Sequence, residues 1–418
     1  MTNSRRAASE ALQRWESSRA FADSIVEKVI RASLDGADAD LAVEIFYGSI
    51  RWKARLDFVM DQSTFKIKEM GVRCLLRTGL YQLLFLDRVP EYAAVNETVA
   101  LAPSNRTSLV NAFLRSFIRE RENWRKRIES CRTEKPEVFY SQPGWLIRKW
   151  ERVFGKNRTR QLLEWNNTIP GVFVRTNTLK SSPGQLQAAL KAHEPKASSH
   201  PLMFEIGSPQ GLFSGEAFRQ GWFYAQDPST LRSVELLDPQ PGESILDPCS
   251  APGGKTTYIA QRMQCQGRIV ASDLDSGRLR LVEENKKRLG CQTIEMTRLD
   301  VLAKSSETFD RTLLDVPCSN SGVLRRRVDL RWRIRNEDIA SLADEQFQLC
   351  LRFSRRLKPG GTLVYSTCSL EAEENENVVE RVCAALPLLR LEATWKSFPP
   401  ETGMDGAFAA KFKLKKSK

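Results

Sequence analysis

The chain has 418 residues, of which 41% are hydrophobic and 28% are charged. These fractions are typical of folded globular proteins and exclude collagen-like, low-complexity and mainly disordered chains, and the length corresponds to roughly two or three domains. Lys and Arg outnumber Asp and Glu by 64 to 51, which gives a formal net charge of +13. This excess points to a polyanionic partner, of which nucleic acid is the commonest.

The sequence predicts no membrane span and no targeting signal. The most apolar segment, 74–86, is short and is interrupted by Arg77 and Gln82, which predicts a buried helix. The N-terminus leads into an amphipathic pattern without an apolar signal core, so we expect a cytoplasmic protein whose nine cysteines stay reduced. With only His193 and His200 in the chain, we expect neither a metal site nor a Ser-His-Asp triad.

Residues 1 to about 128 predict one helix after another. Apolar residues recur at helical spacing, as in Ala22, Ile25, Val26, Val29 and Ile30. Asp40, Asn96 and Ser104 are the candidate N-cap residues. The pattern predicts an all-α domain over residues 1–130.

A basic stretch follows, between about 115 and 149. It fits a solvated helix face with a linker as well as it fits a surface that follows nucleic-acid phosphates. Residues 131–235 then mix helical patterns with short strands, among them 171–175. We expect this segment to form a linker and a small α+β subdomain.

From residue 236 onward the pattern alternates between strand and helix. Strands are expected at 244–247, 268–273, 293–296, 309–315 and 362–366, with helices at 255–263, 276–289 and 337–357. This alternation predicts a doubly wound, mostly parallel sheet over 236–418, which binds ligands at the carboxyl ends of its strands. Near the C-terminus, Phe408, Phe412 and Leu414 alternate with lysines, which predicts a last strand at the sheet edge.

The densest motif runs from Asp247 to Thr256, between an expected strand and an expected helix. Gly253 and Gly254 let the backbone approach a ligand, and a helix N-terminus offers free N–H groups to an anion. A P-loop would need a glycine five residues before Gly254, where Cys249 stands. A nucleotide triphosphatase is therefore disfavoured, and a ligand carboxylate fits these amides instead.

Two acidic residues stand at the ends of the next two expected strands. Asp273 could accept both ribose hydroxyls, and Asp300 could meet an adenine edge. Either residue alone is explained as a helix cap. Together, beside the glycine-rich turn, they favour a nucleoside with a carboxylate-bearing tail, and S-adenosylmethionine fits that description.

Two cysteines follow neighbouring expected strands, Cys318 after Asp315-Val316-Pro317 and Cys368 within Thr367-Cys368-Ser369. Methyltransferases that modify exocyclic amines have Asn/Asp-Pro-Pro-aromatic after the fourth strand, where Cys318 follows Pro317 in this chain. They need no nucleophile, because the amine has a lone pair. A cysteine is useful when the target is carbon 5 of a pyrimidine, because thiolate addition at carbon 6 makes carbon 5 nucleophilic toward a sulfonium methyl group. Spacing alone leaves open which of the two cysteines attacks.

These motifs resemble those of bacterial rRNA cytosine-C5 methyltransferases of the Fmu/Sun type, which join a NusB-like domain to a NOL1/NOP2/Sun-family methyltransferase domain. The resemblance covers nearly the whole chain and rests on Asp-Pro-Cys-Ser, Thr-Cys-Ser and the segments 44–51, 77–85, 93–99, 110–115, 177–180 and 226–229. It implies a multidomain fold: an all-α NusB-like RNA-binding domain (1–130), a linker with a small α+β RNA-binding subdomain (131–235), and an α/β Rossmann-like methyltransferase domain (236–418).

The resemblance also implies the roles of the site residues. Cys368 is the nucleophile, Cys318 assists product release, and Asp315 lies near both the target cytosine and the cofactor. S-adenosyl-L-methionine is bound by Asp273, Asp300, Asp315 and the loop residues Cys249, Ser250, Ala251, Pro252, Gly253, Gly254 and Lys255. The implied reaction methylates carbon 5 of a cytosine in 16S rRNA through a covalent adduct at carbon 6. The substrate is either naked rRNA or a small-subunit assembly intermediate. The implied enzyme is monomeric and contains no metal.

Several residues depart from the usual family pattern: Ser250 and Val316 replace alanines, Asn320-Ser321 replaces Gly-Thr, and Val328 stands where proline is frequent. None of these departures removes a catalytic group. Two other functions stay open: an RNA-binding or assembly module without activity, and a methyltransferase that acts on tRNA.

Overall fold

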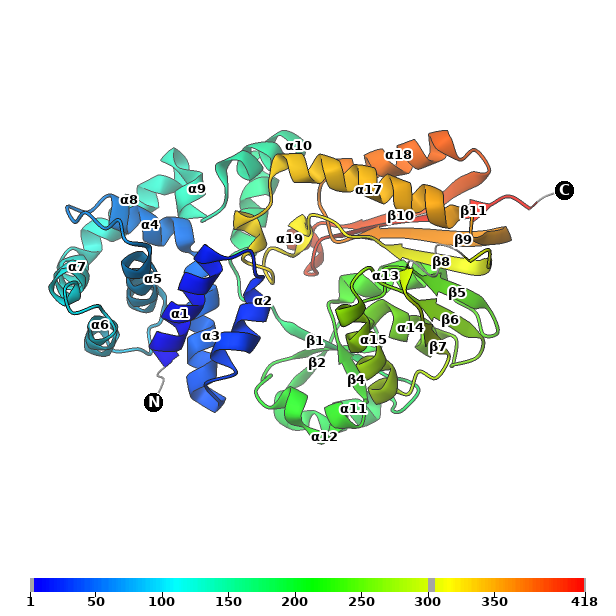
Figure 1. Ribbon diagram of the computed structural model, residues 1–418, viewed down its shortest axis with the longest axis horizontal. Coiled ribbons are helices and arrows are strands. Elements are labelled where there is room, and N and C mark those ends of the chain that lie inside the picture. The colour runs from blue at the N-terminus through cyan, green and yellow to red at the C-terminus, as the bar shows by residue number, and fades with distance from the viewer. Residues whose placement is uncertain (1–3, 300–304, 417–418) are drawn as a thin grey trace. The chain divides into compact units, whose positions relative to one another are not determined.

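The computed structural model describes residues 4–299 and 305–416. The chain divides into two compact units (Figure 1). The N-terminal unit comprises Met1–Thr168 and Leu324–Arg333, and the C-terminal unit comprises Ile169–Val323 and Ile334–Lys418. The structure has two compact units, and the first of them includes a segment that is distant in sequence. The expected division into three parts at residues 130 and 235 therefore stays a prediction.

The N-terminal unit is all-α, as predicted. Its elements are α1 (Ser4–Ser17), α2 (Ala22–Ile25), a π-helical turn (Val26–Ile30), α3 (Gly36–Arg51), α4 (Lys53–Asp61), α5 (Met70–Phe85), α6 (Glu91–Ala100), α7 (Thr107–Arg119), α8 (Arg121–Glu134), α9 (Pro136–Phe139) and α10 (Gly144–Trp165). Helix α10 is kinked at Gly155, whose φ of 76° is left-handed.

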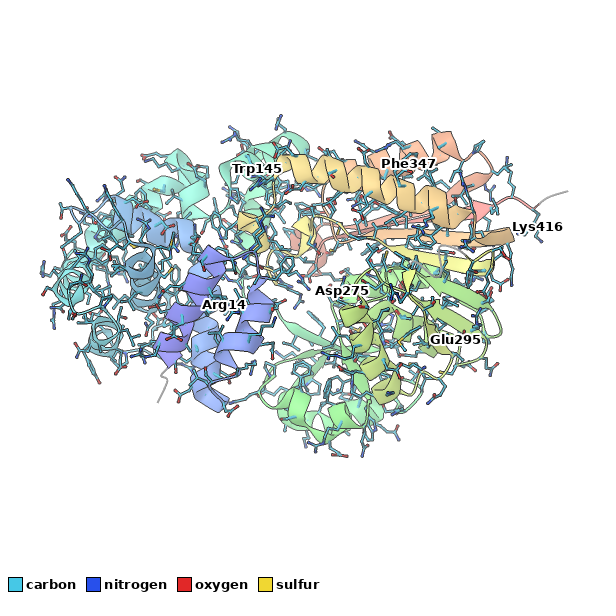
Figure 2. All side chains as sticks on the ribbon, in the orientation of Figure 1. Arg14, Trp145, Asp275, Glu295, Phe347 and Lys416 are labelled. Carbon is cyan, nitrogen blue, oxygen red and sulfur yellow. The ribbon has the colours of Figure 1, made fainter. Side chains whose placement is uncertain are left out.

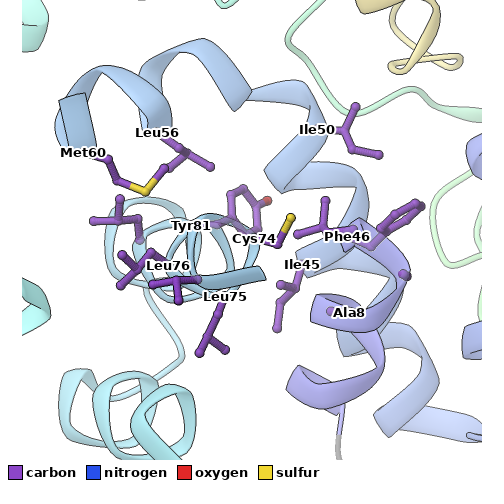
Figure 3. Packing of buried hydrophobic residues seen from close by; sticks show 14 of the residues in the cluster. Ala8, Ile45, Phe46, Ile50, Leu56, Met60, Cys74, Leu75, Leu76 and Tyr81 are labelled. Atoms are coloured by element: carbon purple, nitrogen blue, oxygen red, sulfur yellow. The ribbon is translucent and has the colours of Figure 1, made fainter. Parts of the chain in front are cut away.

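The core of the N-terminal unit surrounds α5, which carries the apolar segment that the sequence marked as a buried helix. Figure 3 shows Cys74 and Tyr81 of α5 beside Ile45 and Phe46 of α3, and these side chains belong to one buried cluster. A Cβ atom at Gly48 would come within 1.9 Å of the Tyr81 ring. Glycine is therefore required at position 48, because any larger residue would separate the two helices.

The helix starts differ from the sequence expectation. Asp40 lies inside α3, whose N-cap is Asp35, and Asn96 lies inside α6. Ser104 precedes α7, whose N-cap is Arg106. None of the three residues is an N-cap, because tertiary packing decides where these helices begin and a polar side chain alone does not.

Residues Leu324–Arg333, which we call the strap, leave the C-terminal unit after the Cys318 loop and belong to the N-terminal unit. Val328 of the strap is fully buried in the N-terminal core. The buried Arg331 guanidinium donates to the carbonyl oxygens of Arg51, Ser141, Asn166 and Leu324 and to Asn167 Oδ1, at 2.8–3.3 Å. These acceptors are all neutral, and burial lowers the pKa of Arg331 well below its usual value.

The C-terminal unit contains two sheets. The smaller is antiparallel, in the order β2-β3-β1-β4. Its strands are β1 (Val172–Thr176), β2 (Pro195–Ala197), β3 (Met203–Ile206) and β4 (Phe223–Ala225), accompanied by α11 (Pro183–Ala189) and α12 (Glu216–Arg219). This is the mixed α+β region that the sequence predicts.

The larger sheet is the Rossmann-like part of the unit. Its order is β10-β11-β9-β8-β5-β6-β7, and β9, β8, β5, β6 and β7 are parallel. The strands are β5 (Ser244–Asp247), β6 (Arg268–Ala271), β7 (Ile294–Met296), β8 (Phe309–Asp315), β9 (Leu357–Thr367), β10 (Leu389–Ser397) and β11 (Ala407–Leu414). The helices are α13 (Leu231–Leu237), α14 (Gly254–Arg262), α15 (Ser276–Leu289), α17 (Asn336–Ser354), α18 (Glu376–Ala385) and α19 (Pro399–Thr402).

Helices cover both faces of this sheet (Figure 1). Cys350 and Phe353 of α17 and Val378 of α18 form one apolar cluster with residues of the strands. Tyr258 of α14 and Val282 of α15 belong to a second cluster, which also contains α13. The three-layer arrangement buries the central strands on both sides and leaves their carboxyl ends for a site.

The last strand is not the sheet edge that its alternating pattern predicts. β11 pairs antiparallel with β9 on one side and with β10 on the other, so β10 is the edge. Strand β9 also begins earlier than expected, at Leu357, and continues through Gly360, whose φ is 77°. Glycine at position 360 allows this backbone irregularity within the strand. From the sequence alone, Pro-Gly-Gly predicts the end of the preceding helix.

We expect Arg331→Met to lower the free energy of unfolding by roughly 3 kcal/mol, because several buried carbonyl groups would lose their donors at about 1–3 kcal/mol each. Urea titration followed by circular dichroism measures this change. Arg327→Met is the matched control in the strap. Arg327 is half-exposed and lies 3.6 Å from Asp23, and its loss should change stability by less than about 0.5 kcal/mol. Equal effects of the two variants would contradict the role given to Arg331.

Candidate active site

The two cysteines predicted from the sequence lie side by side at the carboxyl ends of β8 and β9. These strands are parallel neighbours, with Asp315 opposite Ser366. Cys318 follows the first strand, Cys368 follows the second, and their sulfur atoms are 3.3 Å apart. Both thiols are free and partly buried. The sheet register therefore joins two motifs that are 50 residues apart in sequence.

The loop that carries Cys318 is fastened to the loop that carries Cys368. The Gly322 N–H donates to the Cys368 carbonyl oxygen at 2.9 Å, and a Cβ at Gly322 would lie 2.5 Å from the Gly406 oxygen. Asn320 bridges the two cysteines, since it donates to the Cys318 carbonyl oxygen at 2.7 Å and accepts from Cys368 Sγ at 3.0 Å. Asn320 is one of the departures from the family pattern, and here it touches the predicted nucleophile.

The glycine-rich loop turns from β5 into α14. Gly253 has a φ of 104°, and its N–H donates to the Ser250 carbonyl oxygen at 2.7 Å. The Ala251 N–H donates to Asp273 Oδ2 at 3.2 Å, so the carboxylate after β6 holds the loop. Figure 2 shows Asp275 near the start of α15, and its backbone N–H donates to Asp273 Oδ1 at 3.1 Å.

A buried arginine also holds the glycine-rich loop through hydrogen bonds. Arg175 of β1 donates to the Gly254 carbonyl oxygen at 2.9 Å and to Gln226 Oε1 at 2.6 Å, and its guanidinium lies 4.8 Å from the centre of the Tyr258 ring. Burial lowers the pKa of Arg175 to about 10. A Cβ at Gly254 would lie 2.9 Å from Tyr224, so only glycine fits here. The small sheet and the Gln226 segment thus fix the backbone of the loop.

Charged groups line the space between the glycine-rich loop and the cysteines. Lys255 Nζ lies 2.6 Å from Asp315 Oδ2. Lys255 also lines a small pocket of about 40 Å³, together with Cys368, Thr230 and Trp395. The carboxylates and Cys368 outweigh burial and raise the pKa of Lys255, so this side chain is a cation beside the thiol.

Burial changes the acidity of other groups in the site. It raises the pKa of Asp247 to about 7, assisted by the charge of Asp315, although Thr256 donates to Asp247 Oδ2 at 2.7 Å. It also raises the pKa of Cys249 well above its usual value. The contact with Cys368, together with burial, raises the pKa of Cys318, so Cys318 is a neutral thiol at neutral pH.

The structure brings together the loop 249–255, Asp273, Asp315, Cys318 and Cys368 within the C-terminal unit. Asp300 lies outside the described residues. In residues 4–299 and 305–416, no group of three His, Cys, Asp or Glu side chains could hold a metal ion. Over the same residues, no helix is both long enough and apolar enough to cross a membrane.

Sequence reasoning missed the buried Glu374, which accepts hydrogen bonds from the residues that follow both cysteines. It also missed Arg175. Glu374 lies in a glutamate-rich stretch that is typical of a solvated surface, and Arg175 lies in a predicted strand of no special composition. Their partners are distant in sequence, so no local pattern pointed to either residue.

In helix α8, positive charges of the basic stretch are paired with nearby glutamates. Arg125 pairs with Glu122 at 2.7 Å, and Arg132 pairs with Glu129 at 2.6 Å. Arg127 stacks over the Trp124 ring at 4.4 Å. These contacts favour the solvated-face interpretation for this helix, while the net positive charge of the whole chain is unaffected.

Comparisons with known proteins agree with this geometry. A family model described as 16S rRNA methyltransferase RsmB/F matches residues 234–413, one described as NusB family matches 2–119, and one described as an RsmF/B-like ferredoxin-like domain matches 142–206. A probable ribosomal RNA small subunit methyltransferase B from Synechocystis is 35% identical and covers 91% of this chain and 87% of its own. Its counterpart from Proteus mirabilis is 33% identical and covers 91% and 92%.

Solved structures share the fold. The crystal structure of a protein designated PH0851 has a TM-score of 0.80 at 24% identity and covers 98% of both chains. NSun6 from Pyrococcus horikoshii, crystallised with the S-adenosylmethionine analogue SFG, has a TM-score of 0.60 at 25% identity. It covers 66% of this chain and 99% of its own.

The fold is that of a Rossmann-like methyltransferase with a NusB-like helical domain at its N-terminus. The chain belongs to the family of ribosomal RNA small subunit methyltransferase B proteins, to which full-length relatives at 31–35% identity connect it. The family resemblance seen in the sequence motifs is thereby confirmed.

The raised pKa of Asp247 predicts a pH dependence of stability. Between about pH 4 and pH 7 the folded protein holds a proton that the unfolded chain has released, because the unfolded carboxyl has a pKa of roughly 3.9. The stability that this proton contributes is complete below about pH 4 and is lost as the pH rises to 7. Asp247→Asn has no proton to release there. Its stability relative to the wild type should rise with pH, by at most roughly 1.4 kcal/mol per unit, and level off above pH 7.

Urea unfolding at several pH values measures this difference. Asp238→Asn is the control, since it removes a half-exposed carboxylate 3.5 Å from Arg262. A difference between Asp247→Asn and wild type that stays constant across this pH range would refute the assignment.

Proposed function

We propose that the protein transfers a methyl group from S-adenosylmethionine to carbon 5 of a cytosine in small-subunit (16S) rRNA, through a covalent bond between Cys368 and carbon 6. The observation that carries this proposal is the pair of thiols 3.3 Å apart at the ends of β8 and β9. A second support is the ion pair of Lys255 with Asp315, whose lysine lines one pocket together with Cys368. The relatives named as rRNA small subunit methyltransferases support the substrate class.

The residues of the glycine-rich loop fit S-adenosylmethionine. A Cβ atom would crowd Val282 at Gly253 and Tyr224 at Gly254, so both positions keep a bare backbone that can approach a ligand closely. Asp247 Oδ1 is buried and has no hydrogen-bond partner in the described structure, which leaves a polar atom with which a ligand can pair. We assign the loop 249–255, with Asp273, Asp300 and Asp315, to cofactor binding. When bound, S-adenosylmethionine supplies an electrophilic methyl group on its sulfonium sulfur.

Cys368 is the residue that we assign to attack the base. A free thiol has a pKa of about 8.5, so it needs help to react as a thiolate at neutral pH. Lys255 lines the same pocket as Cys368 and supplies a positive charge there. Addition of the thiolate to carbon 6 turns carbon 5 into a nucleophile, which then accepts the methyl group.

Asp315 and Cys318 serve the remaining steps. The Asp315 carboxylate, oriented by Lys255 at 2.6 Å, is assigned to hydrogen-bond the edge of the cytosine. Cys318, a carboxylate or water must then take the carbon 5 proton. The electron pair of that C–H bond re-forms the double bond between carbons 5 and 6 as the bond between carbon 6 and Cys368 breaks and the thiolate leaves. Cys318 lies 3.3 Å from Cys368 and is assigned to assist this release.

The remaining assignments follow from the family and the composition. We propose that the target base is flipped out of its stack into the site, because a cytosine within a helix hides carbon 6 from a thiolate. The net charge of +13 suits an rRNA or assembly-intermediate substrate. We further propose a monomeric, cytoplasmic enzyme.

The two cysteine variants should fail at different steps. Cys368→Ala should lose methylation and form no RNA adduct, because no nucleophile remains. Cys318→Ala should retain attack and methyl transfer but release slowly, so a covalent RNA–protein species should accumulate. Denaturing gel electrophoresis with labelled rRNA detects the adduct, and bisulfite sequencing detects the methylated cytosine.

Cys383→Ala, on α18 outside both loops, controls for the loss of a thiol and should behave as wild type. If the adduct vanishes with Cys318→Ala and persists with Cys368→Ala, the roles of the two cysteines are reversed. If neither variant changes methylation, the covalent mechanism is wrong.

Cofactor binding gives a further test. Asp273→Asn should weaken S-adenosylmethionine binding at least about tenfold, because a charge-assisted hydrogen bond to a ribose hydroxyl is worth roughly 1.5–3 kcal/mol. Calorimetric titration measures the dissociation constant. Asp310→Asn is the control, because Asp310 lies at the opposite end of β8 and pairs with Lys358 at 2.8 Å. Equal affinity in both variants would remove Asp273 from the cofactor site.

A further inference from the structure

Glu374 is a buried carboxylate that the proposed reaction does not use. It ends a short 3-10 turn, Ala372–Glu374, before α18, and its side chain has no exposed surface. A buried carboxylate is costly unless its oxygens are fully hydrogen-bonded. Its partners therefore indicate what holds it there.

The donors to Glu374 come from both cysteine loops. Oε1 accepts from the Ser319 backbone N–H at 2.8 Å, and Oε2 accepts from the Ser319 hydroxyl. The same Oε2 accepts from the Ser369 hydroxyl. Ser319 directly follows Cys318, and Ser369 directly follows Cys368, so one carboxylate joins the residues next to the two thiols.

A third element completes the set of donors. Gln346 of α17 donates through Nε2 to Glu374 Oε1 at 3.0 Å and to the Pro317 carbonyl oxygen at 2.9 Å. The single hydroxyl proton of Tyr365 in β9 has two acceptors within reach, Gln346 Oε1 at 2.9 Å and the backbone oxygen of Glu374. The residues on both sides of Cys318 are thus tied, directly or through Gln346, to the same carboxylate.

The hydroxyls of Ser319 and Ser369 do not replace the carboxylate. Ser319 Oγ and Ser369 Oγ lie 3.1 Å apart, and each can donate only one proton. In this arrangement both hydroxyl protons point to Glu374. Removal of the carboxylate would leave two hydroxyls, a backbone N–H and an amide competing for too few acceptors. Bonds such as that from the Gly322 N–H to the Cys368 carbonyl oxygen would still join the loops, but the residues next to the thiols would rearrange.

We propose that Glu374 is a positioning residue that sets the distance between Cys318 and Cys368. The proposal rests on the proposed function for its catalytic consequence, but the distance itself is a property of the folded chain. Thiol addition and release both act on one ring, so the second thiol must stay beside the first throughout. A misplacement of about 1 Å can lower a rate by roughly 10²-fold.

The first experiment measures the proximity of the two thiols without any substrate. Full-length protein is equilibrated with reduced and oxidised glutathione, and the Cys318–Cys368 disulfide is quantified by peptide mass mapping. One thiolate displaces a glutathione thiolate from the oxidised dimer, and the other displaces the second, so two reduced glutathiones form for each protein disulfide. The ratio of disulfide to dithiol reports how well the fold holds the sulfur atoms together.

Glu374→Gln should lower this ratio at least about tenfold relative to wild type, and Glu374→Ala should lower it further. Glutamine keeps the size of the side chain, and circular dichroism verifies that each variant is folded. Glu376→Gln is the matched control, because Glu376 is a nearby half-exposed carboxylate 3.2 Å from Lys396 and should leave the ratio unchanged. A folded Glu374→Gln protein with the wild-type ratio overturns the proposal.

The second experiment measures methylation of rRNA. Glu374→Gln should lower kcat by roughly 10²-fold, with the KM for S-adenosylmethionine and for RNA within about threefold of wild type. The reason is that Glu374 bonds Ser319 and Ser369, which are not among the residues assigned to bind the cofactor or the base. A purely structural role would instead raise KM or lower the amount of folded protein, and that result also overturns the proposal. If wild-type protein methylates no cytosine but the disulfide ratio falls as expected, the proposed function fails and the positioning role stands.

Discussion

The site depends on one pairing, that of β8 with β9 as parallel neighbours at the centre of the sheet. With Asp315 opposite Ser366, the loops that follow the two strands start level with each other. A shift by one residue would turn every side chain of β9 to the other face and carry Cys368 away from Cys318. Burial of both faces of these strands under helices makes such a shift costly, so the apolar core specifies the geometry of the thiols.

The Cys318 loop is constrained at several points after its cysteine. Ser319 is held by Glu374, and Gly322 lies against the Cys368 carbonyl and Gly406. Further along, the chain leaves at residue 324 and becomes the strap, whose Val328 and Arg331 are buried within the N-terminal unit. The helical unit therefore includes a segment that continues the Cys318 loop in sequence.

The sequence predicted those features that are local. The strand–helix alternation, the glycine-rich turn and the cysteine positions all follow from periodicity and residue type over short windows, and α15 has the predicted bounds, Ser276–Leu289. The features it did not predict depend on distant partners. The alternating pattern of β11 gave no indication that β10 would pair outside it, and a charged segment gave no sign that Glu374 is buried or that Arg331 is inserted among helices. The helix caps were also misplaced, because packing decides where these helices begin.

Three of the buried charged groups share one property: their hydrogen-bond partners are neutral. Arg331 binds carbonyl groups, Arg175 binds Gly254 and Gln226, and Glu374 binds hydroxyl and amide donors. Removing one of these groups alone is costly, because its buried donors or acceptors are then left without partners. These groups also make the alternatives costly, because each charge must find every one of its donors or acceptors in one arrangement. All three lie where a loop meets another element. A hydrophobic contact at such a place would let the backbone shift, whereas a charged group with several hydrogen bonds fixes its position.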